Sequence, residues 1–426
     1  MLIEFTVQNY ASFNSPQTLS MLASNSTQNN INEKNTFPVN KFGIDNLVKS
    51  AAIFGANASG KSNFINSLLI LQSIILKSLA ETDNLEAVVP FLLKKDVFDI
   101  PSEFEVSFIH KGNMYRYGIS ILKGKIDEEW LYWTKTSKEN FLFQRIGQKI
   151  KINGRSFTEA KDFIKEKNGE LYLEKTRENV PFISVLSQFN GEKSRNVIEW
   201  FRKLHIVSGI NEVGFKKFTI NLLDQDSTFL TWALNILSSF QIQDINIVEL
   251  NKEITAKGFN DAISIKTRNK FKEVEIVKKI EGDEQEYNIP LALESQGTQK
   301  LIYLLGPIFH IINTGEILLV DEFDNKFHSL LSQFILKLYH KENNCNSQLV
   351  ITCHDTHLLT NELLRRDQIW FLDKDSKHES ELYSLLEYKE HYTRQDNSYS
   401  KDYLAGKYGA IPLFKSVDEL EIALNG

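Results

Sequence analysis

The stretch GANASGKS, residues 55–62, decides the fold. It follows the apolar segment Leu47–Phe54, which predicts a short strand, and it leads into an apolar helix beginning at about Ser62. The two glycines allow the backbone to curl and aim its N–H groups at one point. The positive N-terminal end of the helix faces the same point. A chance Gly/Ser turn is the alternative, but the flanking strand and helix favour a phosphate-binding loop.

The loop assigns chemistry to individual side chains. Lys61 is long enough to reach the β and γ phosphates of a nucleotide, and the Ser62 hydroxyl can ligate Mg²⁺. The sequence therefore predicts an ATP site with Mg²⁺ as the metal. The predicted ATP-binding residues are Gly55, Asn57, Gly60, Lys61, Ser62 and Asn63.

A second segment supplies the acids that such a site needs. ILLVDE, residues 317–322, is a continuous apolar strand that ends in two carboxylates, where ligands sit in open α/β sheets. We expect Asp321 to hold Mg²⁺ and Glu322 to act as general base toward water. An acidic turn without catalytic function is the alternative for this segment taken alone.

Composition places few limits on function. The chain has 426 residues, 42% of them hydrophobic, and a net charge of −6, which does not indicate a nucleic-acid-binding face. Two cysteines cannot form a disulfide framework. The start of the chain lacks a basic signal-peptide region, and polar residues interrupt the most apolar stretch, Phe64–Leu79. We therefore expect a cytoplasmic protein that does not enter a membrane.

The patterns along the chain predict an α/β protein. Residues 24–46 are rich in Asn, Ser and Thr and predict a surface loop. Period-two alternation from about Glu103 to Ile152 predicts an antiparallel β subdomain, and Asp244–Ile289 predicts more strands. We expect one domain, with a core at 1–80 and 290–426 and inserted β and helical subdomains at 81–289. The space between Ser62 and Ser295 leaves no room for a long coiled coil.

The order of four motifs resembles the ABC/SMC-type P-loop ATPases. ESQGTQ at 294–299 precedes a helix, and LVITCHD at 349–355 is an apolar strand that ends in histidine. Asn57 and Asn63 make the phosphate loop similar to the SMC and RecF branch, which includes the overcoming-lysogenisation-defect proteins. The whole chain resembles the compact ATPases of phage-defence operons, of the RloA or abortive-infection AbiL type. Five segments carry this similarity: Met1–Phe13, Pro101–Phe104, Ser295–Lys300, Asp321–His328 and Tyr403–Pro412.

The resemblance implies an ABC/SMC-type ATPase head, with a mixed sheet, that works as a homodimer with ATP sandwiched between two heads. The signature residues Ser295, Gln296 and Gly297 would contact the γ-phosphate bound to the other protomer. For Ser295, a plain helix N-cap is the alternative, and both can be true. His354 would contact the γ-phosphate within its own protomer, and a strand-end histidine satisfied by backbone is its alternative. The resemblance also implies a Q-loop glutamine at the Mg²⁺ site, besides Ser62 and Asp321. We place it at Gln188, with Gln144 as second choice.

Three functions remain open. The first is a dimeric switch of an anti-phage system that controls a separate effector, a nuclease or RNase from the same operon. The second is an ATPase-nuclease, for which Asp373-Lys374-Asp375 would bind metal, although we favour a charged hairpin turn there. The third is a DNA-binding repair ATPase of the RecF type.

Two further predictions concern metal and partner surfaces. Cys353, His354 and His357 could suggest zinc, but the sequence offers no second Cys/His group to complete four ligands. The segments from about Glu103 to Ile152 and from Tyr403 to Pro412 are candidate docking surfaces for the effector, and packing against the core is the alternative for both.

Overall fold

The computed structural model describes residues 1–25, 32–81, 84–208, 212–257, 264–282, 285–342, 345–388 and 399–412. The chain forms two compact units. The first comprises Met1–Ser208, Thr314–Asn325 and Ser329–Gly426, and the second comprises Gly209–Asn313 with Lys326–His328. Within the described residues, no helix is both long enough and apolar enough to span a membrane.

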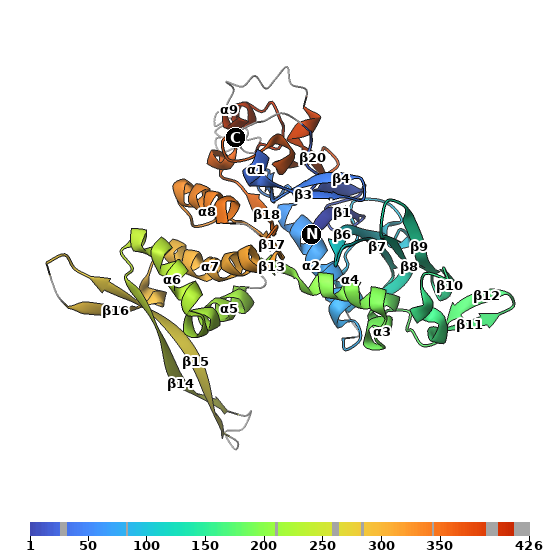
Figure 1. The fold of residues 1–426 in the computed structure, drawn as a ribbon, viewed down its shortest axis with the longest axis horizontal. Helices are drawn as coiled ribbons and strands as arrows, with labels where there is room; N and C mark the ends of the chain where they lie inside the picture. The colour runs from blue at the N-terminus through green and yellow to red at the C-terminus, as the bar shows by residue number, and fades with distance from the viewer. Residues whose placement is uncertain are drawn as a thin grey trace, which may run out of the picture. The chain divides into compact units, whose positions relative to one another are not determined.

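The first unit contains a six-stranded mixed sheet, part of which is labelled in Figure 1 as β13 (Leu204–Val207), β17 (Ile317–Val320) and β18 (Gln348–Cys353). Five of its strands are parallel, and only the last is antiparallel to its neighbour. Strand β17 is buried along its whole length, as expected for the middle of a parallel sheet. In order across the sheet, the strands are β13 (Leu204–Val207), β17 (Ile317–Val320), β18 (Gln348–Cys353), β5 (Ser50–Phe54), β19 (Ile369–Lys374) and β20 (Ser380–Ser384).

The second sheet of this unit has nine antiparallel strands and confirms the predicted antiparallel subdomain. Its order is β11 (Ile164–Lys167), β12 (Glu170–Leu173), β10 (Lys149–Ile152), β9 (Glu139–Ile146), β8 (Lys125–Thr134), β7 (Asn113–Leu122), β6 (Ser102–His110), β1 (Leu2–Gln8) and β2 (Gln17–Ser20). Buried and less buried side chains alternate along β6, because one face of the sheet lies on the core.

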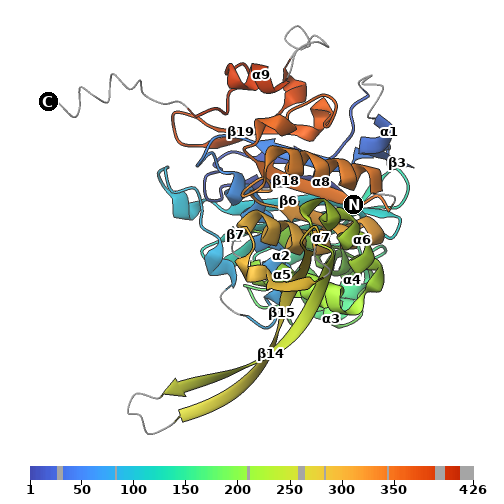
Figure 2. The ribbon, with the colours of Figure 1, turned by 90° about the vertical axis from the view of Figure 1, so that its left-hand side faces the viewer.

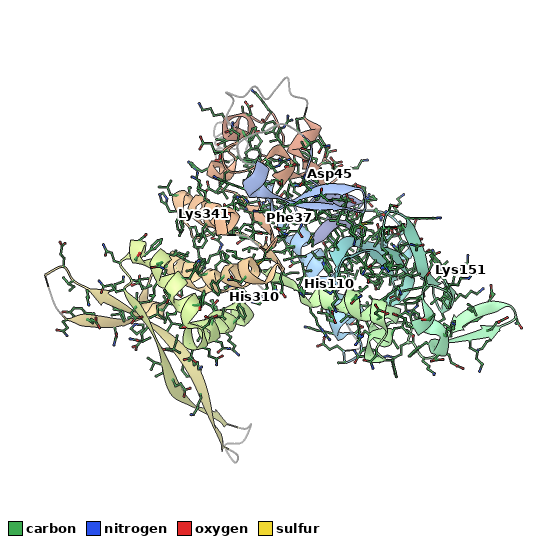
Figure 3. The ribbon with its side chains drawn as sticks, in the orientation of Figure 1. Phe37, Asp45, His110, Lys151, His310 and Lys341 are labelled. Carbon is green, nitrogen blue, oxygen red and sulfur yellow. The ribbon has the colours of Figure 1, made fainter. Side chains whose placement is uncertain are left out.

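Three helices connect these sheets. Helix α2 (Lys61–Lys77) directs Phe64 against Phe5 of β1, with ring centroids 5.6 Å apart. Helices α3 (Phe182–Gln188) and α4 (Glu192–Arg202) contact each other and α2. The Trp200 ring of α4 stacks on the Phe108 ring of β6, with centroids 4.2 Å apart. His110, labelled in Figure 3, lies at the end of β6, and its Nε2 is 3.3 Å from Oε2 of Glu199 of α4. The described part of this unit also contains α8 (Ser329–Glu342) and α9 (Tyr399–Leu404).

The prediction of a surface loop at residues 24–46 is wrong. Helix α1 (Asn32–Asn35) and a β3–β4 hairpin (Thr36–Lys41, Ile44–Val48) occupy much of it, while residues 26–31 lie outside the described part of the chain. Phe37, labelled in Figure 3, pairs with Leu47, and both are buried. Val48 is buried as well, so apolar side chains anchor this hairpin, although Asn, Ser and Thr are frequent in residues 24–46 as a whole.

The second unit combines helices with a three-stranded antiparallel sheet. Its helices are α5 (Glu212–Gln225), α6 (Ser227–Leu237) and most of α7 (Gln296–Thr314). Its strands are β14 (Asp244–Lys257), β15 (Ser264–Lys279) and β16 (Glu286–Pro290), and Figure 2 shows β14 and β15 as a long two-stranded ribbon.

The α/β class, the mixed sheet, the antiparallel subdomain and the helical insertion are thus confirmed. The longest helix among the described residues is α7, with 19 residues, so that part of the chain holds no long coiled coil. The nine-stranded sheet joins β1 and β2 from the predicted core to strands of the predicted insertion. The predicted boundaries at 1–80, 81–289 and 290–426 remain a prediction.

Candidate nucleotide site

Sheet order brings three distant motifs to one edge. Strands β17, β18 and β5 are adjacent and parallel, with Val320 opposite Ile351 and Cys353 opposite Phe54. The segments that follow these strands begin at Asp321, His354 and Gly55. They therefore meet at the carboxyl edge of the sheet, where open α/β sheets bind ligands.

The lysine of the phosphate loop donates hydrogen bonds to the backbone of the same loop. Lys61 is the first residue of α2 and is buried, and its Nζ donates hydrogen bonds to the carbonyl oxygens of Gly55 (2.8 Å) and Ala56 (2.9 Å). Burial lowers the pKa of Lys61, and the nearby carboxylates of Asp321 and Glu322 oppose that shift. The ammonium therefore lies at the start of the helix, within the electrostatic influence of the acids after β17.

Both fixed glycines of the loop are required by close contacts. A Cβ on Gly55 would lie 2.2 Å from the carbonyl oxygen of Leu372. Gly60 has φ 113°, and a Cβ there would lie 2.5 Å from Ser380 Oγ and 2.7 Å from Ser12 Oγ. Side chains do not fit in either place, so the two glycines of the motif are needed in this fold for steric reasons.

Ser12 and Ser380 fasten the loop from outside, and sequence reasoning missed both. Ser380 Oγ donates to the carbonyl oxygen of Ser59 (2.6 Å), and Ser380 N donates to the carbonyl oxygen of Ser12 (2.8 Å). Asn63, predicted to bind ATP, donates its Nδ2 to Ser12 Oγ (2.9 Å). Asn57 is exposed on the loop, and Ser62 is half-buried in the first turn of α2.

Thr352 organises the two predicted acids. Its Oγ1 donates to Asp321 Oδ1 (2.6 Å) and accepts from the backbone N–H of Glu322 (2.8 Å). Glu322 has φ 49°, a left-handed conformation unusual for a residue other than glycine. Asn325 Nδ2 donates to Glu322 Oε2 (2.9 Å), so this carboxylate has a fixed neighbour on its own loop.

The histidine segment is tied to the same acidic loop. Asp324 Oδ2 accepts hydrogen bonds from the backbone N–H groups of His354 (2.8 Å) and Asp355 (2.5 Å). Desolvation and the charge of Lys61 lower the pKa of His354, against the opposing charges of Asp324 and Glu322. His354, Lys61 and the acidic loop therefore lie within electrostatic reach of one another.

The signature residues belong to the second unit. Ser295 Oγ accepts from the backbone N–H of Thr298 (3.1 Å), which is the geometry of a helix N-cap on α7. Ser295 and Gln296 are exposed. A Cβ on Gly297 would lie 2.5 Å from the carbonyl oxygen of Lys326, so the turn after the acids packs on the signature glycine. The cap is present, and a contact with a second protomer remains a proposal.

The placement of Gln188 as a Mg²⁺ ligand is wrong. Gln188 is the last residue of α3, whose Ser184 hydroxyl donates to the carbonyl oxygen of Ile75. Ile75 lies near the far end of α2, about 20 Å of helix away from Lys61. Gln144, the second choice, lies on β9, where it donates to Glu128 of β8.

The alternative metal sites do not assemble. Asp373 Oδ2 accepts from the backbone N–H of Ala410, and Asp375 Oδ1 accepts from those of Lys377 and Glu379, so both carboxylates hold turns. Within the described chain, the ligand atoms of Cys353, His354 and His357 do not gather within 4.8 Å of one another. Burial also raises the pKa of the Cys353 thiol, which disfavours the thiolate that zinc requires.

Comparison with solved structures finds heads of SMC proteins at low identity. An SMC head bound to the C-terminal winged-helix domain of ScpA is 11% identical, with a TM-score of 0.44 over 90% of this chain and 97% of that chain. The SMC head domain from Thermotoga maritima is 13% identical, with a TM-score of 0.40 over 90% of this chain and 98% of that chain.

Comparison with protein-family models shows the family to which the chain belongs. Among curated proteins, none matches this sequence. The model of one family, described as "AAA domain, putative AbiEii toxin, Type IV TA system", matches residues 50–360. This match covers well over half of the chain and contains the phosphate loop, the acidic strand and the histidine segment. The protein belongs to this family of AAA domains.

Proposed function

We propose that this protein is an ATP-hydrolysing homodimeric switch of an anti-phage defence system, which controls a separate effector protein. The observation that carries the proposal is the convergence of Lys61, Asp321 and His354 at the carboxyl edge of one sheet. This edge supplies a phosphate-binding loop, acids for metal and water, and a histidine near the lysine. Those are the parts that phosphoryl transfer to water needs.

The donor set suits Mg²⁺. Ser62 offers a hydroxyl and Asp321 a carboxylate, and oxygen ligands of this kind are those that Mg²⁺ prefers. The Thr352 hydroxyl bonded to Asp321 Oδ1 would keep that carboxylate oriented, as outer partners of metal ligands do. When bound, the metal would neutralise charge on the phosphates. Glu322, oriented by Asn325, would accept the proton of the attacking water.

Two copies would complete the site. Ser295, Gln296 and Gly297 lie at the N-terminal end of a 19-residue helix, and the first two are exposed. A helix N-terminus favours anions, so this end is suited to a γ-phosphate bound to another protomer. ATP would then favour the dimer, and slow hydrolysis would release it.

The effector would be a different protein. ATP binding can shift the protein between two conformations, and a partner that binds one of them more tightly associates with the protein in that conformation. The family description, which names an AbiEii toxin, supports a defence setting. Strands β6–β10 offer one docking surface. The Tyr403–Pro412 surface is smaller than its sequence suggests, because Tyr403 and Tyr408 stack on Phe371 and are buried.

Replacement of Glu322 by glutamine tests the proposal. Glu322→Gln keeps the metal and phosphate contacts but removes the base, so ATP affinity should persist while turnover falls at least about a hundredfold. Light scattering should then find an ATP-dependent dimer that outlasts that of the wild type. Glu362→Gln, the same change at an exposed position, is the matched control. Wild-type turnover in Glu322→Gln would contradict the assignment of the base, and a monomer at saturating ATP would contradict the switch.

A further inference from the structure

Asp324 connects the two catalytic loops of the first unit. It lies three residues after Asp321, yet its Oδ2 accepts no bond from its own loop among the described residues. Both bonds come from the neighbouring loop after β18, from the backbone N–H groups of His354 and Asp355. Hydrogen bonds to an ionised acceptor are about twice as strong as neutral ones, so this single oxygen is a firm anchor.

We infer that Asp324 is a positioning residue that fixes His354 beside the acidic loop and is required for turnover through His354. The inference rests on the proposed ATPase function and adds a residue to it. Among the described residues, further hydrogen bonds between the loops run through Thr352, which binds Asp321 and Glu322 and lies before the histidine. Asp324 is the residue whose side chain reaches the backbone of His354 itself.

The cost of the arrangement supports a role beyond capping. Asp324 Oδ1 is buried and has no hydrogen-bond partner among the described residues. A buried carboxylate oxygen without a donor is unfavourable unless nearby charge compensates. The Lys61 ammonium supplies such charge, since Asp324 and Lys61 interact electrostatically. The carboxylate is thus hydrogen-bonded to the histidine segment and within electrostatic reach of the phosphate-loop lysine.

The anchor also explains how the His354 loop keeps its shape. Asp355, the second residue held by Asp324, accepts from the backbone N–H of His357 through its own Oδ1 (2.9 Å) and so caps the short helix Thr356–Leu358. Removing Asp324 frees two consecutive N–H groups at the start of this segment. The backbone at His354 would then lose the hydrogen bond that ties it to the acidic loop, and the start of the segment would become more mobile.

The test compares Asp324→Ala, Asp324→Asn, His354→Ala and the double variant with a matched control. Asp324→Ala should keep ATP affinity but lower kcat roughly 10–100-fold, as loss of an orienting partner does. Asp324→Asn retains an oxygen that can accept both N–H groups but loses the negative charge near the Lys61 ammonium, so it should recover part of the turnover. Asp324→Ala combined with His354→Ala should be no slower than the slower single variant, because both changes remove one function. Asp226→Ala, which also removes two hydrogen bonds to backbone N–H groups, should lower the melting temperature but not kcat.

A second readout does not depend on activity. Hydrogen–deuterium exchange at the amides of His354 and Asp355 should be faster in Asp324→Ala than in wild type and close to wild type in Asp324→Asn. Unchanged exchange in Asp324→Ala, additive losses in the double variant, or an inactive Asp324→Asn would each overturn the inference. A wild-type protein without ATPase activity, together with faster exchange in Asp324→Ala, would instead reject the proposed function and leave the anchor intact.

Discussion

At the scale of single residues, the Thr352 hydroxyl determines how the acidic loop is presented. It bonds the carboxylate of Asp321 and the backbone N–H of Glu322 at the same time. The Glu322 backbone is in a left-handed conformation, which the surrounding bonds must hold in place. One hydroxyl therefore supports both Asp321, the proposed metal ligand, and Glu322, the proposed base.

Thr352→Val removes the hydroxyl and keeps nearly the same side-chain volume, so its effects report on the lost hydrogen bonds and not on altered packing. It removes two part-buried hydrogen bonds, each worth about 1 kcal/mol in the free energy of unfolding. We also expect the Mg²⁺ concentration for half-maximal ATPase activity to rise roughly 10–100-fold. Urea unfolding and magnesium titration measure both effects. Thr352→Ser keeps the hydroxyl and should stay close to wild type, whereas an unchanged magnesium dependence in Thr352→Val would contradict this role.

Residues that belong to a sequence motif can be predicted from the sequence. Residues that reach the site only because the fold brings distant parts of the chain together cannot. Lys61 and Asp321 stand in recognisable patterns, and the structure places them at one sheet edge. Ser12, Ser380 and Thr352 have no local pattern, because their partners lie far away in the chain. Gln188 was misplaced because nothing local distinguishes a metal-binding glutamine from one at the exposed end of a largely buried helix.

At the scale of elements, apolar runs predicted the strands of the mixed sheet better than polar segments predicted loops. Ile317–Val320 coincides with β17, since four consecutive buried residues leave little choice. The β3–β4 hairpin was missed, because its inward residues are few and its other positions resemble a loop. Strand β5, which leads into the phosphate loop, is also held by a polar contact: Ser50 Oγ bonds His340 Nε2 of α8 at 2.9 Å.

This contact between α8 and β5 should make stability depend on pH. Burial lowers the pKa of His340 to about 3, so the ring stays neutral in the folded protein. In the unfolded chain the ring takes up a proton below about pH 6.5. Between these values the unfolded state binds more protons, so the free energy of unfolding falls as the pH falls, by up to about 1.4 kcal/mol per pH unit.

Urea unfolding at pH 7, 6 and 5 measures this slope. His340→Gln should give a shallower slope between pH 6 and 5, whatever its stability at pH 7. His378→Gln, a change at an exposed histidine, should keep the wild-type slope. Equal slopes for wild type and His340→Gln would show that His340 is not the group that titrates.

At the scale of the whole molecule, the sequence predicts the order of the motifs along the chain. It does not predict which of the strands that carry them are adjacent in the sheet. The sequence places the signature before the acids and the histidine after them, yet only the sheet order shows that β17, β18 and β5 are adjacent. The signature lies in the second unit, on a helix whose start is exposed. A working site therefore requires, in our proposal, the second unit of another copy.

Subunit mixing tests this central claim most directly. Lys61→Ala removes the phosphate contact, and Ser295→Asp keeps an equally good N-cap while placing a negative charge against the γ-phosphate. Each variant should be inactive alone, and a mixed dimer should carry one site with neither change. Random exchange at equal amounts should therefore restore about a quarter of the wild-type ATPase rate, because half of the dimers are mixed and each has one intact site of two. An active Ser295→Asp homodimer, or no recovery despite demonstrated exchange, would show that Ser295 only caps its helix.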